Sequence, residues 1–244
     1  IRGKGTFNRS IEAVRLLKVA GLPVCVRTTI NQINLQNLGE IADLLLNDLK
    51  LPSFGTNDVV ALGSGCDNQK DIGLSTMQRL EAMKVLAELN KKYDNRIEAT
   101  AGPVALWKRF REMEKLRSRE EFNPGWLPGQ LSACGCIFNR LAAHHDGAIT
   151  PCHMLPELII GRLGADCLSS LWKTNDHLNM MRKRISKKMK DVEECEACDW
   201  SSYCNGGCPA LPYQNHRSFH KADLNDCYKI FLDQTNGKKP WLIT

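Results

Sequence analysis

The chain has 244 residues, of which 43% are hydrophobic and 25% charged, so its composition is globular and excludes disordered and fibrous classes. Its 33 basic and 27 acidic residues leave a net charge of +6, which is too weak to predict nucleic-acid binding. No apolar run approaches the length of a membrane span, and no signal peptide opens the sequence. We therefore expect a cytoplasmic protein without a membrane partner and, because the sequence begins with Ile1, part of a longer chain.

Helices and strands are predicted to alternate in the first half. A first helix should carry Ile11, Val14 and Leu17 on one face, begin after Asn8 as its N-cap, and stop before Gly21. Further along, the pattern predicts a strand over 24–30, a helix over 34–49, a strand over 58–62, a helix that begins with a capping box at 75–78, a strand over 96–100 and a helix over 103–119. Such alternation predicts a parallel sheet covered by helices. Two or three strands cannot close a barrel, so this half is either a piece of a larger barrel or a complete small α/β domain.

Cysteines divide the chain into two regions. Only Cys25 and Cys66 of the 11 cysteines fall in the first 133 residues, and the other nine lie between Cys134 and Cys227. The stretch 121–129 contains two prolines and two glycines, which is typical of a linker. We therefore predict an α/β domain over residues 1–120, a linker over 121–133, a cysteine-rich domain over 134–235 and a tail over 236–244.

The cysteine spacing predicts a metal centre. An odd number of cysteines in a long chain without a secretory signal argues against a disulfide framework. Four of them, Cys195, Cys198, Cys204 and Cys208, fall within fourteen residues, and only a bound cation offsets so many thiolate charges cheaply. Zinc is one alternative, but its paired knuckles do not fit the separations of five and three residues that follow Cys198. Eight interleaved cysteines can instead hold two clusters of four irons each.

The whole pattern resembles the seven-cysteine SPASM domain, which follows the radical SAM barrel in peptide-modifying enzymes. The matching positions are Cys136-x10-Gly147-x4-Cys152, Cys195-x2-Cys198-x5-Cys204-x3-Cys208 and Cys227. The first half resembles the later strands and helices of a radical SAM barrel, on the stretches 1–7 and 26–31. This resemblance implies an α/β fold in which the C-terminal part of a partial (β/α)6 radical SAM barrel, residues 1–120, is followed by a small, loop-rich SPASM domain, residues 134–235, with a β-hairpin and short helices.

The resemblance also implies how the ligands are shared between two auxiliary [4Fe-4S] clusters. The first cluster would take Cys136, Cys152 and Cys208, and the second would take Cys195, Cys198, Cys204 and Cys227. The candidate for the fourth ligand of the first cluster is Cys134, because residues two apart in an extended segment face the same side. Sulfatase maturases carry the corresponding cysteine further upstream, and without Cys134 the first cluster would have an open iron that could ligate substrate.

The resemblance predicts where S-adenosylmethionine (SAM) would bind. The Cys-x3-Cys-x2-Cys motif that holds the SAM-cleaving cluster does not occur in this sequence, so SAM and a third [4Fe-4S] cluster are expected only in the full-length enzyme, and this chain alone is expected to be inactive. Arg27 and Thr29 share one face of the predicted strand and are the candidates for SAM contact; a solvent-facing or core-edge position is the alternative. Asn57 and Asp58 would open the next strand, whereas barrel ligands collect at carboxyl ends, which counts against them.

Several other side chains have simpler interpretations. Cys25, Cys66 and Cys167 match no family position and are expected to be buried structural thiols. The triplet 144–146 (His-His-Asp) precedes a glycine and predicts a hairpin turn instead of a metal site. His153 replaces the catalytic carboxylate of sulfatase maturases, which argues against sulfatase maturation; it could act as a base or as a hydrogen-bonding side chain. The basic run at 181–190 is expected to be a solvated helix face, with an acidic leader peptide or nucleic acid as alternative partners.

Taken together, the residues and the resemblance predict part of a radical SAM/SPASM maturase. Such a protein would bind two auxiliary [4Fe-4S] clusters, help to oxidise a peptide or protein substrate, and exchange electrons with an external donor or acceptor. The alternative is a non-catalytic zinc or iron–sulfur module for peptide binding or electron transfer. Nucleic acid is not the expected partner, because aromatic residues make up only 7% of the chain and base-stacking platforms are not supported.

Overall fold

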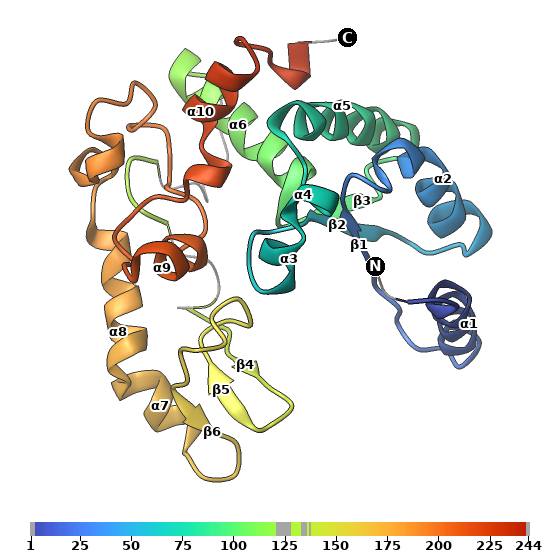
Figure 1. The fold of residues 1–244 in the computed structure, drawn as a ribbon, viewed down its shortest axis with the longest axis horizontal. Coiled ribbons are helices and arrows are strands. Elements are labelled where there is room, and N and C mark those ends of the chain that lie inside the picture. The colour runs from blue at the N-terminus through green and yellow to red at the C-terminus, as the bar shows by residue number, and fades with distance from the viewer. Residues whose placement is uncertain (1–2, 121–127, 133–135, 137, 243–244) are drawn as a thin grey trace. The chain divides into compact units, whose positions relative to one another are not determined.

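The computed structural model describes residues 3–120, 128–132, 136 and 138–242 (Figure 1). It divides into two compact units: one comprises the chain up to Arg109 together with the segment from Gln234 onward, and the other comprises Phe110–Asp233. Residues 121–127 of the predicted linker lie outside the described residues, and the predicted domain limits stay predictions. No helix in the described part of the chain is both long and apolar enough to cross a membrane.

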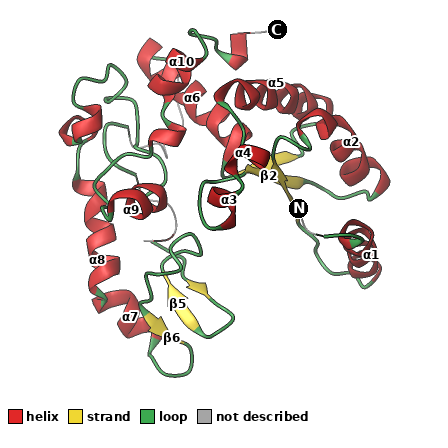
Figure 2. Cartoon of the chain, viewed as in Figure 1, coloured by secondary structure: helices red, strands yellow, loops and turns green. Residues whose placement is uncertain are grey.

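The first unit contains a three-stranded parallel sheet in the order β1-β2-β3. Figure 2 draws its strands in yellow and labels the central strand, β2. Val26 pairs with Phe54 and Thr29 with Asn57 between β1 and β2, and Phe54 pairs with Ile97 between β2 and β3. The unit contains, in chain order, α1 (Thr6–Val19), β1 (Val26–Ile30), a 3-10 turn (Leu35–Asn37), α2 (Leu38–Asp43), a π-helical turn (Leu44–Asp48), β2 (Phe54–Asp58), α3 (Ser64–Asp67), α4 (Gln69–Ile72), α5 (Thr76–Lys92), β3 (Ile97–Ala99) and the start of α6 (Gly102–Ser118), and a 3-10 turn (Pro240–Leu242) closes the chain. The predicted alternation of helices and strands is thus confirmed.

One face of this sheet is packed and the other is more open. Ile30, Phe54 and Ile97 are buried in a single apolar core with residues of α2 and α5. The capping box predicted at 75–78 is present, because the Ser75 side chain accepts a hydrogen bond from the Gln78 backbone while the Gln78 side chain accepts one from the Ser75 backbone. Such a cap stabilises the start of α5 by about 1 kcal/mol. The sheet is therefore held from one side by two helices.

The open face carries the residues that alternate with this core. Arg27 and Thr29 are exposed on β1, and their register partners on β2 are the partly buried Gly55 and Asn57. This alternation follows from the two-residue period of a strand. Among the described residues β1 pairs with β2 alone, so within this part of the chain its other edge has no strand partner.

Two predicted boundaries in this unit are wrong. The second strand spans Phe54–Asp58 and not 58–62, so Asn57 and Asp58 close the strand instead of opening it. The run that follows turns at once, since the Leu62 N–H bonds back to the Val60 carbonyl at 2.8 Å. The first helix begins after Gly5, whose φ of 78° only glycine adopts easily, and not after Asn8. Asn57 and Asp58 thus lie at the carboxyl end of β2, where barrel folds bind their ligands. The position in the strand therefore no longer argues against them as ligand-binding residues.

The second unit has little regular structure. It contains a small antiparallel sheet of β4 (Ala142–Ala143), β5 (Ala148–Thr150) and β6 (Gly161–Arg162), and the helices α7 (Leu168–Thr174), α8 (Asp176–Lys183), α9 (Ala210–His216) and α10 (Tyr228–Gln234), with 3-10 turns at Arg184–Ser186, Met189–Asp191, Glu193–Cys195 and Leu224–Asp226. The hairpin predicted before Gly147 is confirmed. Its turn is fixed by Asp146, whose carboxylate accepts the Ala148 N–H at 3.0 Å, a bond that lowers the pKa of Asp146.

Candidate metal centre

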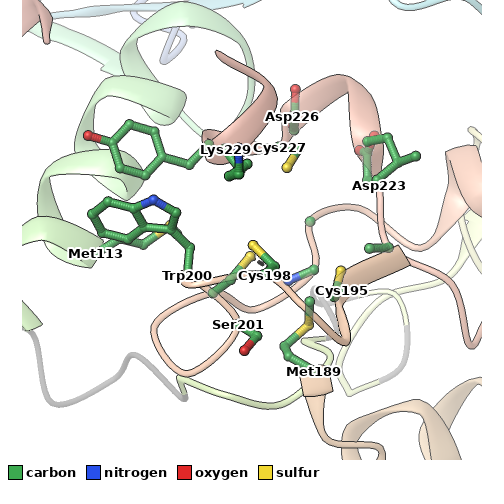
Figure 3. A pocket seen from close by; sticks show the side chains of 16 residues that line it. Met113, Met189, Cys195, Cys198, Trp200, Ser201, Asp223, Asp226, Cys227 and Lys229 are labelled. Atoms are coloured by element: carbon green, nitrogen blue, oxygen red, sulfur yellow. Dashed lines mark hydrogen bonds between the residues drawn. The ribbon is translucent and has the colours of Figure 1, made fainter. Parts of the chain in front are cut away.

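Four cysteines of the second unit surround one cavity. Cys195, Cys198, Cys204 and Cys227 all line it, and we call this group the Cys195 site. Figure 3 shows the sulfur atoms of Cys195, Cys198 and Cys227 directed toward the same space. No disulfide joins any two cysteines of the described residues. Donors that face a shared cavity as thiols are suited to hold a thiophilic metal centre.

The backbone around Cys195 curls in successive tight turns. The Cys195 N–H bonds to the Val192 carbonyl at 2.8 Å, and the Cys198 N–H bonds to the Cys195 carbonyl at 3.1 Å. One further turn follows, in which the Cys204 N–H bonds to the Trp200 carbonyl at 2.9 Å. The two-residue and five-residue gaps between these cysteines are therefore bridged by tight turns, which return the chain to the same cavity each time.

Burial makes two of these thiols, those of Cys195 and Cys227, harder to ionise. Burial raises the pKa of Cys195 to about 12, and the neighbouring Cys204, Cys198 and Cys227 add to the shift. Burial also raises the pKa of Cys227. Cys195 and Cys227 therefore favour the protonated thiol, and a bound metal centre would offset the charge of their thiolates.

Backbone N–H groups point at cysteine sulfur atoms, among them those of Cys152, Cys204 and Cys208. In these three cases the donor is the residue two positions after the cysteine: Met154 donates to Cys152 at 3.5 Å, Gly206 to Cys204 at 3.3 Å and Ala210 to Cys208 at 3.4 Å. Hydrogen bonds to ligand sulfur stabilise thiolate charge and set the reduction potential of iron–sulfur clusters. This repeated contact suits a cluster-binding protein.

Three further cysteines form a second group. Cys136 is buried, and Cys152 and Cys208 pack against the same apolar cluster as Cys136. We call these three the Cys136 site. The predicted fourth ligand, Cys134, lies outside the described residues. Of the ten described cysteines, four therefore line one cavity and three share one apolar cluster. Their role as metal ligands stays a prediction, and no three His, Cys, Asp or Glu side chains of the described residues lie close enough to hold a single metal ion.

One buried arginine near both sites was missed by sequence reasoning. Arg184 belongs to the basic run that was expected to be solvated, but it is 0% exposed and donates to backbone carbonyls, among them those of Gly206 and Gly207. α8 ends at Lys183, so the run is not one helix face. A signal was present: Arg184 follows the buried Leu178 and Met181 at intervals of three residues, which places it on the buried side.

The three cysteines outside the sites are exposed, so the expectation of buried structural thiols is wrong. Cys25, Cys66 and Cys167 all lie at the surface, and hydrogen bonds from Ser169 and Ser170 lower the pKa of Cys167 to about 7. A cysteine outside the metal sites can pack as a small apolar residue, but nothing in the sequence required these three to do so.

The remaining candidates lie as follows. Arg27 and Thr29 are on the open face of the sheet, as their spacing predicted. At the carboxyl end of β2, Asp58 is buried and paired with Arg79, with 3.0 Å between Oδ2 and Nε. His153 is exposed, and His144 contacts the Thr150 hydroxyl at 2.9 Å inside the hairpin. Neither histidine is part of the Cys195 or Cys136 group.

Comparison with known proteins supports the resemblance seen in the sequence. The chain is 22% identical over 221 residues to an AdoMet-dependent heme synthase of Methanosarcina barkeri, an alignment that covers 86% of this chain and 57% of the relative. It is 30% identical over 90 residues to the cysteine-type anaerobic sulfatase-maturating enzyme of Clostridium perfringens, covering 34% of this chain and 22% of that enzyme. No family model matches the chain.

Solved structures give the same result for the fold. The chain is similar to a histidine-tagged form of anSMEcpe with bound AdoMet, with a TM-score of 0.56, 17% identity, and coverage of 95% of this chain and 57% of that one. It is also similar to native anSMEcpe with bound AdoMet and the Kp18Cys peptide, with a TM-score of 0.55, 17% identity, and coverage of 95% and 60%. The predicted resemblance to AdoMet-dependent maturases, and the mixed α/β fold, are confirmed. The chain spans less than two thirds of the length of these relatives.

Proposed function

We propose that this chain is the C-terminal portion of a radical SAM/SPASM enzyme and binds two auxiliary [4Fe-4S] clusters. The observation that carries the proposal is the sorting of seven cysteines into two groups, one around a single cavity and one around a single apolar cluster. Cys195, Cys198, Cys204 and Cys227 would hold one cluster, and Cys136, Cys152 and Cys208, together with Cys134, the other. These cysteines would hold clusters that could serve as one-electron acceptors for a substrate that has lost a hydrogen atom, with an external acceptor taking up the electron.

The first unit would contribute to SAM binding in the full-length enzyme, which would hold a third [4Fe-4S] cluster on its own cysteine motif. Arg27 and Thr29 present polar groups on the open face of the sheet, and Asn57 stands opposite Thr29 in the register. The edge of β1 that has no strand partner among the described residues is where preceding strands of a partial (β/α)6 barrel would pair, because such an edge exposes backbone donors and acceptors. SAM bound at the open face, near Arg27 and Thr29, would lie at the carboxyl ends of the strands, where barrel folds bind their ligands.

We infer the substrate class from the similar proteins. One of the similar structures holds a peptide together with AdoMet, which supports a peptide or protein substrate here. A second candidate is a heme-forming reaction, because the alignment with the heme synthase covers 86% of this chain and the sulfatase-maturating enzyme only 34%. The two are distinguished by giving the full-length enzyme SAM, a reductant and either peptides or tetrapyrrole precursors, and by following which of them changes mass.

Metal content tests the proposal most directly. Anaerobic reconstitution of the chain with iron and sulfide should give about eight irons per chain. The double variant Cys195→Ala/Cys198→Ala should keep about four, and the matched variant Cys167→Ala, which lies outside both sites, should keep about eight. A colourless protein that binds only zinc would support instead the non-catalytic zinc module for peptide binding.

A further inference from the structure

Arg184 is held inside the second unit by backbone oxygens. It is 0% exposed, and its guanidinium donates to the carbonyls of Ser132 at 2.7 Å, Lys221 at 2.7 Å, Gly206 at 3.3 Å and Gly207 at 3.4 Å, and also to that of Phe219. A cation at this depth is costly unless its donors are satisfied, and these carbonyls satisfy them. A side chain with so many contacts to separate backbone stretches fixes their relative positions.

The stretches that Arg184 holds are those that carry the cysteines. Gly206 and Gly207 stand between Cys204, a member of the Cys195 site, and Cys208, a member of the Cys136 site. The Ser132 carbonyl lies four residues before Cys136, and the Lys221 carbonyl lies six residues before Cys227. A single guanidinium therefore contacts the backbone on the approach to both sites.

Hydrogen bonds between these stretches complete the arrangement. The Ser132 N–H bonds to the Asn205 carbonyl at 2.7 Å, and the Asp223 N–H bonds to the Gly206 carbonyl at 2.8 Å. The loop from Cys204 to Cys208 is thus tied to both neighbouring segments, with Arg184 in the middle. Lysine cannot replace this geometry, because its three donors sit on one atom while the guanidinium presents five donors in a planar fork.

We infer that Arg184 is a positioning residue that couples the two cluster sites, an inference that rests on the proposed function. Arg184 binds backbone oxygens, and it acts by holding the shared loop 204–208 in the conformation that presents one ligand to each site. Its buried positive charge also lies near two centres that become anionic when thiolates bind iron. Loss of the guanidinium geometry therefore weakens both sites together, and loss of one cluster disturbs the other.

The test compares Arg184→Lys with Arg182→Lys, a conservative change of a nearby arginine whose guanidinium stacks on Trp172 at 4.7 Å. Both variants and the unchanged chain are reconstituted anaerobically and exposed to an iron chelator. Residues that position ligands typically change metal affinity 10- to 100-fold, so we expect about 10-fold faster iron loss from both sites of Arg184→Lys and unchanged loss from Arg182→Lys. Iron loss at the unchanged rate, or faster loss from one site only, would overturn the coupling.

A second variant covers the case in which Arg184→Lys does not fold. Cys227→Ala leaves Arg184 in place and removes one ligand of the Cys195 site, and electron paramagnetic resonance of the reduced protein then reports on the cluster at the Cys136 site. We expect that signal to shift or broaden relative to the unchanged chain, and an identical signal would contradict the inference. Failure of the unchanged chain to bind iron would count against the proposed function itself, so the two failures are distinguishable.

Discussion

The ring of Tyr228 meets the indole of Trp200 edge-on, with 4.8 Å between the ring centroids. Both residues line the cavity of the Cys195 site, and both are buried. The rings of Phe110 and Tyr228 stack with 4.5 Å between their centroids, and the Arg117 guanidinium lies 4.4 Å from the centroid of the Trp200 ring. One wall of the cavity is therefore aromatic and closely packed, which limits the access of water to the sulfur atoms.

Removing this wall should make the cluster that we propose at the Cys195 site more sensitive to air. In Trp200→Ala we expect the visible absorption of the reconstituted protein to decay several-fold faster in air, because solvent and oxygen reach the cluster more easily. Trp200→Phe keeps a ring in place and should decay close to the rate of the unchanged chain. Trp172→Ala is the control, since Trp172 lines a different hollow of the same unit. Equal decay rates in the three variants and the unchanged chain would show that Trp200 does not shield the proposed cluster from air.

The loop that joins the two sites depends on a glycine. Gly206 has a φ of +74°, and a Cβ at this position would lie 2.3 Å from a methyl group of Leu131. An alanine at this position costs free energy because of its positive φ. The contact with Leu131 should lower the free energy of unfolding of Gly206→Ala by about 1–3 kcal/mol more. We also expect Gly206→Ala to have a lower iron content. Gly164→Ala measures that conformational cost by itself, because Gly164 has a φ of +77° and no neighbouring atom near its Cβ position.

Urea unfolding and iron content of the two glycine variants check this prediction. Equal losses of stability in Gly206→Ala and Gly164→Ala would show that Leu131 moves aside without cost. A normal iron content in Gly206→Ala would show that loop 204–208 tolerates the shift.

The order of helices and strands in the first unit could be predicted from the sequence, whereas the limits of individual elements could not. The division of the cysteines into two ligand sets came from the family resemblance, and it stays a prediction, although four of these cysteines line one cavity and three pack against one apolar cluster. The strand β2 was misplaced because Gly55, Asn57 and Asp58 have low strand propensity, whereas the run 59–62 is rich in strand formers. The observed strand is stabilised by pairing with β1 and β3. These contacts join residues far apart in the sequence, so the local sequence of β2 does not reveal them. Arg184 was misassigned for a similar reason, since its basic neighbours suggest a solvated surface.

Asp58 and Arg79 form the most buried ion pair that the structure describes in the first unit. Their side chains are 10% and 17% exposed, with 3.0 Å between Oδ2 and Nε. Asp58→Asn removes the charge at constant shape and replaces a largely buried ion pair with a neutral contact, so we expect a loss of about 1–3 kcal/mol in the free energy of unfolding of this unit. Asp233→Asn, which breaks the exposed pair with Lys229, should cost about 0–1 kcal/mol.

Denaturant unfolding followed by far-ultraviolet circular dichroism measures both losses. The iron content of Asp58→Asn should equal that of the unchanged chain, because every described cysteine of the two candidate sites belongs to the second unit. A loss no larger than that of Asp233→Asn would mean that water screens the Asp58–Arg79 pair as fully as a surface pair.

Among the described cysteines, Cys167 should be the most reactive one of the reconstituted protein near neutral pH. Its side chain is exposed, and the hydrogen bonds with Ser169 and Ser170 hold its pKa at about 7, so a large fraction is thiolate at pH 7. The alkylation rate with iodoacetamide should rise with pH through about 7 and then level off, because a lowered pKa moves ionisation to lower pH. Ser169→Ala removes the main hydrogen bond and should shift that rise to higher pH, whereas the peptides containing Cys25 and Cys66 should label at unchanged rates. Mass spectrometry of the labelled peptides at several pH values measures these alkylation rates. If the pH profile of Cys167 is the same in Ser169→Ala, the hydrogen bond with Ser169 does not lower the pKa of Cys167.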